Sequence, residues 1–495
     1  MTVMTSKRWL CLLLPAVLLG TLVACSPLGA DPASGSILPD QPTLPPPTVI
    51  GVPTAVEVSP FSEYRIVMTL DTTGQRLDGK QRVTFPNHTG VDLDEIVFRL
   101  YPNLPQYGGA MSVASVWVDG ERSSSSLRAE DTSLVISLGR PLAPESSVTI
   151  EMAYDIEIPV KESDYSLFGN DQGIWSLPDA YPLLAVHDGA GWREDIAPAH
   201  GDAVFADAAL YDVTLTLPPT QTLVTTGSVL SETLDLNGRQ SYRIRGGPLR
   251  EFAFLASDQY QMAETTAYGT VLRSYYLQGD DAAGQATLNI AAAALRSYED
   301  AFGPYPFDDM IVAEGPLLYY GMEYPGLNLI GAHLYREQRA ELENRVVHEI
   351  AHQWWYAQVG NDQVNTPWLD EGLAEYSMVF YYEQVFGEAR ANTLVNQRWL
   401  VPYQVAVENE YDAVVNQPSS AFTWEYEVIV YAKAALFFHA LRQEVGDETF
   451  RAIMLEYVGQ FRWGIATPDD FLDVAESVSG RDLDPLYNRW ILSKQ

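Results

Sequence analysis

The sequence has almost no cysteine. Of its 495 residues only Cys11 and Cys25 are cysteines, and both lie near the N-terminus. The remainder of the chain therefore has no disulfide and no thiolate that could hold a metal ion. Any metal bound there must be held by histidine, aspartate or glutamate.

Positive charge is also scarce. Lys and Arg total 30 against 65 Asp and Glu, which gives a formal net charge of −35. Binding of nucleic acid requires a basic face that neutralises phosphates, so the composition excludes nucleic acid as a partner. An acidic surface of this kind mainly favours solubility, and a mild preference for cationic substrates is the alternative.

The apolar run at the N-terminus, residues 9–24, is too short for a membrane-spanning helix, which needs about 20 residues. It follows Lys7 and Arg8 and so has the form of an export signal. It ends in LVAC, which resembles the lipobox of bacterial lipoproteins. That resemblance implies cleavage before Cys25 and a lipid anchor on its thiol. The alternative is an uncleaved signal anchor. The lipid anchor and the signal anchor both predict an extracytoplasmic protein tethered to a membrane.

Three further segments follow residues 1–25. Residues 26–55 are rich in Pro, Gly and Ser and predict an extended tether. Residues 56–260 contain short alternating runs such as YRIVMTLD, VTIEMAYD and YDVTLTLP, which predict an all-β, sandwich-like domain. From about residue 261 to 495 we expect a second domain in which helices dominate.

The helices of this second part have recognisable starts and stops. ATLNIAAAALRSYEDAF is followed by a Gly-Pro stop, and further helices are expected at residues 368–386 and 426–445. Thr467 followed by proline predicts the start of another. Residues 309–315 have the pattern of a buried strand, with an extended segment at 321–331 beside it.

The segment VVHEIAHQWW, residues 346–355, has the pattern of a buried helix and yet contains three polar groups in five positions. His348 and His352 are four residues apart, so both rings leave one face and can reach one ion at about 2.0 to 2.1 Å. Glu349 lies beside them, where it can hold a water molecule without being a ligand. Three such groups on an apolar helix are otherwise hard to satisfy.

A third ligand is expected on the next helix. Glu371 lies in NTPWLDEGLAEY, with eighteen residues between it and His352. Two histidines and a glutamate leave one position of a tetrahedral zinc site open for water, which is typical of catalytic zinc. The sequence therefore predicts one Zn²⁺ held by His348, His352 and Glu371.

The spacing from HEIAH to Glu371 resembles that of the gluzincin zinc aminopeptidases, to which aminopeptidase N and leukotriene hydrolase belong. The segment Gly321-Met322-Glu323-Tyr324-Pro325 is similar to the GxMEN segment of this family, and VYAKAALFF is similar to its YxKGA helix. The resemblance covers about residues 56 to 495. It implies a thermolysin-like α+β, mostly helical catalytic domain after the β domain, and peptide substrates with a free N-terminus.

The resemblance also implies roles for single residues. Glu349 would be the general base, and Tyr431 would stabilise the developing oxyanion. Glu323 would bind the α-ammonium group of the substrate, with Gly321 and Met322 lining the substrate beside it.

Other positions are less directly matched. Tyr426 is a further candidate for substrate contact, and Asp370 and Glu375 are candidates to accept the second N–H of a zinc-bound histidine. Tyr324 and Pro325 depart from GxMEN, which changes the expected shape of the pocket.

Two other functions fit parts of the pattern. A zinc endopeptidase has the same HExxH motif, although Glu323 argues against it. A non-catalytic peptide-binding or zinc-binding surface protein would not need Glu349 and Tyr431. Because the larger members of the family have a helical domain after the catalytic one and this sequence stops at Gln495, we expect a more open cleft.

Overall fold

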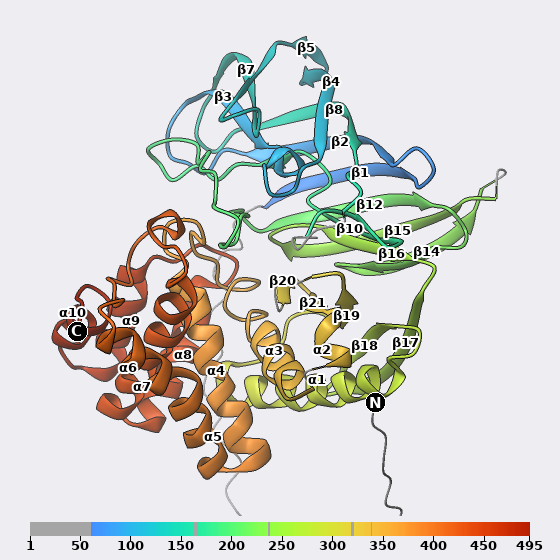
Figure 1. The fold of residues 1–495 in the computed structure, drawn as a ribbon. Helices are drawn as coiled ribbons and strands as arrows, with labels where there is room; N and C mark the ends of the chain where they lie inside the picture. The colour runs from blue at the N-terminus through green and yellow to red at the C-terminus, as the bar shows by residue number, and fades with distance from the viewer. Residues whose placement is uncertain (1–60, 162–166, 236–237, 318–320, 338) are drawn as a thin grey trace, which may run out of the picture. The chain divides into compact units, whose positions relative to one another are not determined.

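The computed structural model describes residues 61–161, 167–235, 238–317, 321–337 and 339–495. The predicted signal, Cys25 and the tether at 26–55 lie outside these residues. Strands fill the first half of the described chain and helices most of the second half (Figure 1). The prediction of an N-terminal β domain followed by a mostly helical part is confirmed.

The largest sheet has eight strands, because long stretches of the first half alternate buried and exposed side chains. In β1, for example, Tyr64, Ile66, Met68 and Leu70 are buried and the residues between them face outward. The strand order is β14 (Ser228–Leu234), β15 (Gln240–Leu249), β12 (Ala209–Leu217), β1 (Ser62–Asp71), β2 (Arg76–Pro86), β8 (Ser147–Glu157), β4 (Ala110–Val118) and β5 (Glu121–Ser123).

Two four-stranded sheets complete the strand-rich half. One has the order β13 (Thr222–Thr225), β16 (Ala253–Ser257), β10 (Ile174–Pro178) and β9 (Gly169–Asp171). The other has the order β11 (Leu183–Leu184), β3 (Leu93–Arg99), β7 (Ser133–Leu142) and β6 (Ser125–Arg128). One hydrophobic core joins all three sheets and reaches Ile311 and Leu329 of the next sheet.

The fourth sheet belongs to the second half of the chain. Its order is β17 (Tyr260–Ala267), β18 (Thr270–Leu277), β19 (Asp309–Gly315), β21 (Leu327–Gly331) and β20 (Gly321–Tyr324). The expectation that helices dominate from residue 261 is wrong for 260–277, which form a hairpin. Tyr268 and Gly269 make its two-residue turn with φ values of 54° and 92°, a conformation suited to a tight hairpin.

In the part of the chain that the structure describes, the α-helices begin at Asp281. They are α1 (Asp281–Phe302), α2 (Ala332–Arg336), α3 (Arg339–Ala351), α4 (Trp368–Phe386), α5 (Glu388–Leu394), α6 (Val401–Glu408), α7 (Ala434–Val445), α8 (Asp447–Phe461), α9 (Pro468–Ser479) and α10 (Asp484–Trp490). Two π-helical segments, η2 (Val395–Leu400) and η4 (Glu427–Lys433), precede α6 and α7, and two 3₁₀ turns lie at Tyr101–Asn103 and Ser419–Ala421. Among the described residues, none of the helices combines the length and the apolar character needed to cross a membrane.

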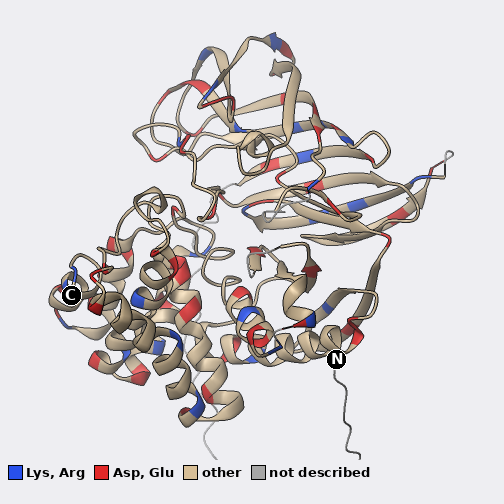
Figure 2. Cartoon of the chain, in the orientation of Figure 1, with Lys and Arg blue, Asp and Glu red and all other residues tan. Residues whose placement is uncertain are grey.

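Helix α3 lies against α1 and α4 in the second half (Figure 1). Its residues Val346, Val347 and Ile350 are buried in the core that all three helices share. Figure 2 marks the positions of acidic residues on both the strands and the helices, interspersed with basic ones, which the sequence has in smaller number. The packing of α3 and α4 fixes the two segments that contain the predicted metal ligands.

Candidate active site

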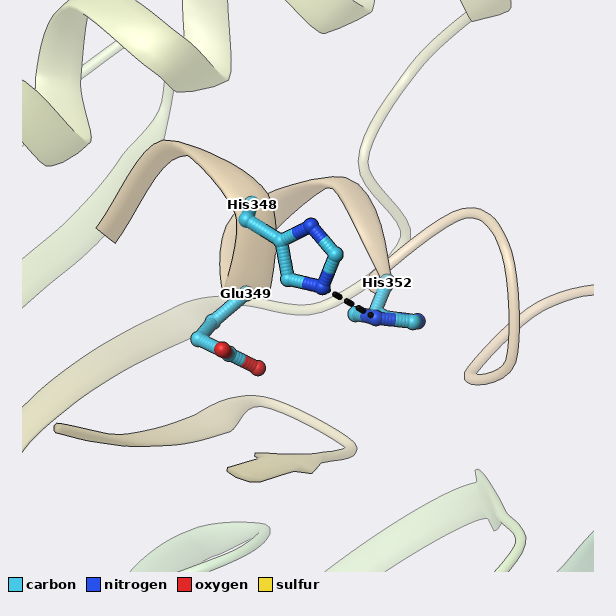
Figure 3. A group of neighbouring side chains, drawn as sticks. All are labelled: His348, Glu349 and His352. Atoms are coloured by element: carbon cyan, nitrogen blue, oxygen red, sulfur yellow. Dashed lines mark hydrogen bonds between the residues drawn. The ribbon is translucent and has the colours of Figure 1, made fainter. Parts of the chain in front are cut away.

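The HExxH segment spans the end of a helix. Helix α3 ends at Ala351, so His352 is the first residue of the turn that follows, and the ring still faces that of His348 (Figure 3). Glu349 leaves the same helix with its carboxylate beside the two rings. Because the apolar residues of α3 face the core, these three polar side chains are left facing the cavity.

Three donor atoms of the predicted ligands converge. The Nε2 atom of His348 lies 3.1 Å from Oε2 of Glu371 and 3.2 Å from Nε2 of His352. Nε2 of His352 lies 3.3 Å from the same oxygen of Glu371. Ligands of a tetrahedral zinc ion with bonds of 2.0 to 2.1 Å are separated by about 3.3 Å. The spacing of this donor set therefore fits zinc.

The other ring nitrogens also favour a cation at this point. Nδ1 of His352 lies 2.8 Å from the carbonyl oxygen of Trp355, and Nδ1 of His348 lies 2.9 Å from Oε2 of Glu375. In the tautomer that carries the proton on Nδ1, which such neighbours favour, both Nε2 atoms have lone pairs. Two lone pairs and a carboxylate oxygen repel one another unless a cation lies between them.

Glu375 is held in place by two residues that the sequence analysis missed. Its carboxylate accepts bonds from Nε1 of Trp399, at 2.7 Å, and from Nε of Arg398. Burial alone would raise the pKa of Glu375, but Arg398 and His348 hold it well below its usual range. No sequence signal marks Arg398 and Trp399, since they lie in the π-helix η2, more than twenty residues after Glu375.

Glu349 approaches the backbone of the edge strand β20. A Cβ atom at Gly321 would lie 2.2 Å from Oε1 of Glu349, so only glycine leaves room for this carboxylate. A carboxylate oxygen of Glu349 and one ring nitrogen each of His348 and His352 all lie within 4.8 Å of one another. The carboxylate of Glu371 is closer to both histidines, at 3.1 and 3.3 Å. Burial raises the pKa of Glu349, and the neighbouring histidines oppose the shift.

Glu323 is buried on the His352 side of the site. Its Oε1 accepts a bond of 3.0 Å from Nε2 of Gln363, which also donates to Oδ2 of Asp370 at 2.7 Å. Asp370 accepts a second bond from Asn361. Asp370 thus orients Gln363. It does not accept the second N–H of a histidine, as the sequence suggested, because Nδ1 of His352 faces the Trp355 carbonyl. Burial raises the pKa of Glu323 to about 8.

Two tyrosines also line the cavity. The hydroxyl of Tyr431 donates to Oε1 of Glu371 at 2.5 Å, and its ring centroid lies 5.8 Å from that of His348. Tyr431 is part of the π-helix η4, and such segments are frequent at functional sites. Tyr426 precedes η4 and lies edge-on to Tyr431 and to His200, with ring centroids 6.0 and 5.0 Å apart.

The three predicted ligands, Glu349, Glu323 and the two tyrosines line one cavity of about 960 Å³, together with Met322. The strand-rich half contributes His200, Gly201 and Asp202, which the sequence analysis did not single out. Burial and the carboxylates of Glu323 and Glu371 raise the pKa of Asp202. The structure thus brings together every predicted site residue within the described chain, and Cys25 lies outside it.

Comparison with known proteins finds a matching protein family for the helical half of the chain. Residues 286–490 match the Peptidase family M1 domain. The alanine/arginine aminopeptidase of Saccharomyces cerevisiae is 29% identical over 264 residues, which are 48% of this chain and 29% of the yeast protein. Aminopeptidase M1-C of Oryza sativa subsp. japonica is 26% identical over 248 residues, which are 46% of this chain and 27% of the rice protein. The chain spans less than a third of the length of these relatives.

Solved structures resemble a larger share of the chain. The M1 zinc metallopeptidase from Deinococcus radiodurans covers 88% of this chain and 94% of its own, with a TM-score of 0.66 and 20% identity. A variant of that enzyme bound to a Tyr-Ser-Ala substrate covers 88% and 95%, with a TM-score of 0.67 and 19% identity. At this identity the likeness establishes the fold, a β domain followed by a mostly helical domain.

Proposed function

We propose that this chain, whose residues 286–490 match the Peptidase family M1 domain, is a zinc-dependent aminopeptidase. The observation that carries the proposal is the convergence of His348, His352 and Glu371, whose donor atoms are 3.1 to 3.3 Å apart. Curated relatives named aminopeptidases and solved M1 zinc metallopeptidases support it. One zinc ion held by these three residues is part of the proposal.

The surrounding residues have separate tasks in peptide hydrolysis. Zinc, when bound, would supply Lewis acidity and lower the pKa of water towards 7. Glu349 would accept a proton from the attacking water and pass it to the leaving amine. The Tyr431 hydroxyl, aimed at Glu371 in this structure, would turn to the developing oxyanion of the substrate and donate to it.

Glu323 would restrict cleavage to the first peptide bond. Its carboxylate is fixed by Gln363 on the His352 side of the site, where it can bind the α-ammonium group of a peptide. Gly321, Met322 and Tyr426 line the same cavity and would contact the first residue of the substrate. An endopeptidase would have no use for a buried carboxylate at this position.

The test compares amino-acid p-nitroanilides with free and acetylated α-amines, with and without a chelator, on the full-length protein. We expect chelator-sensitive cleavage of the free-amine substrates alone, and loss of that selectivity in Glu323→Gln. Equal cleavage of the acetylated substrates would instead indicate an endopeptidase. Zinc binding without any cleavage would indicate a peptide-binding surface protein.

We further propose that the mature protein is an extracytoplasmic lipoprotein anchored to a membrane through Cys25. The basic residues Lys7 and Arg8, the short apolar run and LVAC before the cleavage point support this proposal. Metabolic labelling with a radioactive fatty acid is expected to label the wild type and not Cys25→Ala. Label retained in Cys25→Ala would contradict the lipid anchor on this thiol.

A further inference from the structure

One wall of the cavity is apolar and exposed to solvent. Val401, Val405, Tyr411 and Trp424, which we call the apolar shelf, line the cavity and are 44%, 51%, 47% and 66% exposed. Pro402, Ala406 and Val428 continue the same wall inward. Large apolar side chains that gather beside a polar site and remain in water are typical of a binding surface.

The shelf is built from helix α6 and two loop residues. Val401 and Val405 are one turn apart on α6 and share a face, while Tyr403 and Ala406 of that helix are buried. Tyr411 and Trp424 pack edge to face with ring centroids 4.3 Å apart. Two rings that support each other in this way present a preformed apolar surface.

The position of the shelf relative to the histidines indicates what it would bind. Glu323 and Asp370 lie on the His352 side. On the His348 side lie Glu375 and then Trp399 of η2, and α6 follows η2 directly in the chain. Helix α6 also packs against η4, the element of Tyr431. A peptide whose N-terminus is at Glu323 would therefore extend past the histidines towards the shelf.

We infer that the apolar shelf binds the peptide side chains that follow the cleaved bond. This inference rests on the proposed aminopeptidase function and adds a substrate class to it, namely peptides with large apolar residues in the second and third positions. The cavity volume of about 960 Å³ lies near the upper end of the range for ligand pockets, about 300 to 1,000 Å³, and leaves room for more than one residue. The occupant is continuous with the reacting peptide, so no separate partner is required.

The experiment uses the full-length protein and three substrates with the same first residue: Ala-Leu-Leu, Ala-Ser-Ser and alaninamide. We expect the kcat/KM of Ala-Leu-Leu to exceed that of Ala-Ser-Ser by roughly tenfold. The double variant Val405→Ser, Trp424→Ser should reduce this ratio to about one, mainly by raising KM for Ala-Leu-Leu. Leu455→Ser, which replaces a 48% exposed residue of α8 outside the cavity, is the matched control and should leave the ratio unchanged.

A binding measurement separates the shelf from catalysis. In the Glu349→Gln background, calorimetry should show tighter binding of Ala-Leu-Leu than of Ala-Ser-Ser, and the shelf substitutions should remove the difference. If alaninamide is cleaved but the ratio survives the shelf substitutions, the inference is wrong and the proposed function stands. The first residue is the one that the p-nitroanilide panel favours if that residue is not Ala, and cleavage of no member of the panel means that the proposed function itself fails. If the substitutions dissociate an oligomer instead, the shelf is an interface between copies and the inference is overturned.

Discussion

The absence of a Cβ atom at Gly321 leaves room for the carboxylate of Glu349. The Cβ atom of Gly321→Ala would lie 2.2 Å from Oε1 of Glu349, so the carboxylate must move. A displacement of about 1 Å at a reacting group costs about a hundredfold in rate, and we expect a loss of that order in kcat. The melting temperature should change little, because Gly321 is half-buried in an edge strand.

Steady-state kinetics on a free-amine p-nitroanilide would measure this loss. The matched control is Gly459→Ala, since a Cβ atom there would meet no atom within 4 Å. A Gly321→Ala protein with unchanged kcat would show that the position of Glu349 does not matter for the reaction.

Glu375 is the residue on which the orientation of His348 depends. In Glu375→Ala, Nδ1 of His348, Nε of Arg398 and Nε1 of Trp399 all lose their acceptor. Removing such a partner typically weakens metal affinity 10- to 100-fold, and we expect a loss of roughly that size for zinc.

Zinc content measured along a chelator titration would report the change. Glu383→Ala is the control, because Glu383 lies on the same helix and pairs with Arg442. Equal zinc retention in both variants would contradict the role assigned to Glu375.

At the scale of elements, the end of β19 provides a prediction on stability and pH. Glu314 is buried there, accepts a bond from the Leu277 amide at 2.8 Å and faces both Arg336 and Asp280. Burial raises its pKa to about 7 from an ordinary value near 4.5. A raised carboxyl pKa contributes stability that is present below pH 4.5 and is lost as pH rises through 7.

Glu314→Gln resembles the protonated form at every pH. The variant is therefore expected to melt at a higher temperature than the wild type at pH 8, with a difference that fades towards pH 4.5. Thermal melts across this range would test the prediction, and a difference independent of pH would contradict it.

The elements also show what the sequence could predict. Helix α4 has the bounds 368–386 that its pattern indicated, and Thr467 makes a capping box with Asp470 at the start of α9. The hairpin at 260–277 was missed because its strands are partly exposed and carry no long apolar run. The π-helical form of η4 could not be foreseen either, since its residues have the same apolar period as an α-helix.

The candidate site divides in the same way. His348 and His352 could be predicted because residues four apart in a helical turn point to the same side, and Glu371 because its separation from them resembles that in the zinc aminopeptidases. Residues that act through contacts between distant segments, such as Gln363 and Asp202, have no local pattern and emerge only when the chain is folded.

At the scale of the whole molecule, Arg250 connects the two halves. This buried guanidinium donates to the backbone oxygens of Ala206 and Gln358, both at 3.2 Å, and of Gly464 at 2.5 Å. It also donates to the carbonyl of Tyr356, a residue with φ of 130° in the segment after His352. The strand-rich half thus holds a strained turn next to a predicted ligand.

Arg250→Met would remove all four of these bonds and would leave the Ala206 and Tyr356 carbonyls without this donor, while the carbonyls of Gln358 and Gly464 keep bonds from the backbone amides of Trp463 and Gly360. Each lost bond to a charged group costs about 1.5 to 3 kcal/mol, and we expect the free energy of unfolding to fall by about 3 kcal/mol or more. Denaturant melts followed by circular dichroism would measure this, with the exposed Arg245→Met as control. Equal stability of the two variants would contradict the role of Arg250 as a connection.

The contact of Arg250 with the turn after His352 has a consequence for exchanging the two halves of the chain by recombination or engineering. A gene fragment that encodes only the helical half would still contain the whole predicted zinc-binding motif. It would lack the Arg250 side chain that holds the following turn and the residues His200–Asp202 that line the cavity. The two halves are therefore expected to function only together. Recombination or engineering that exchanges one half must retain the contacts that Arg250 makes across them.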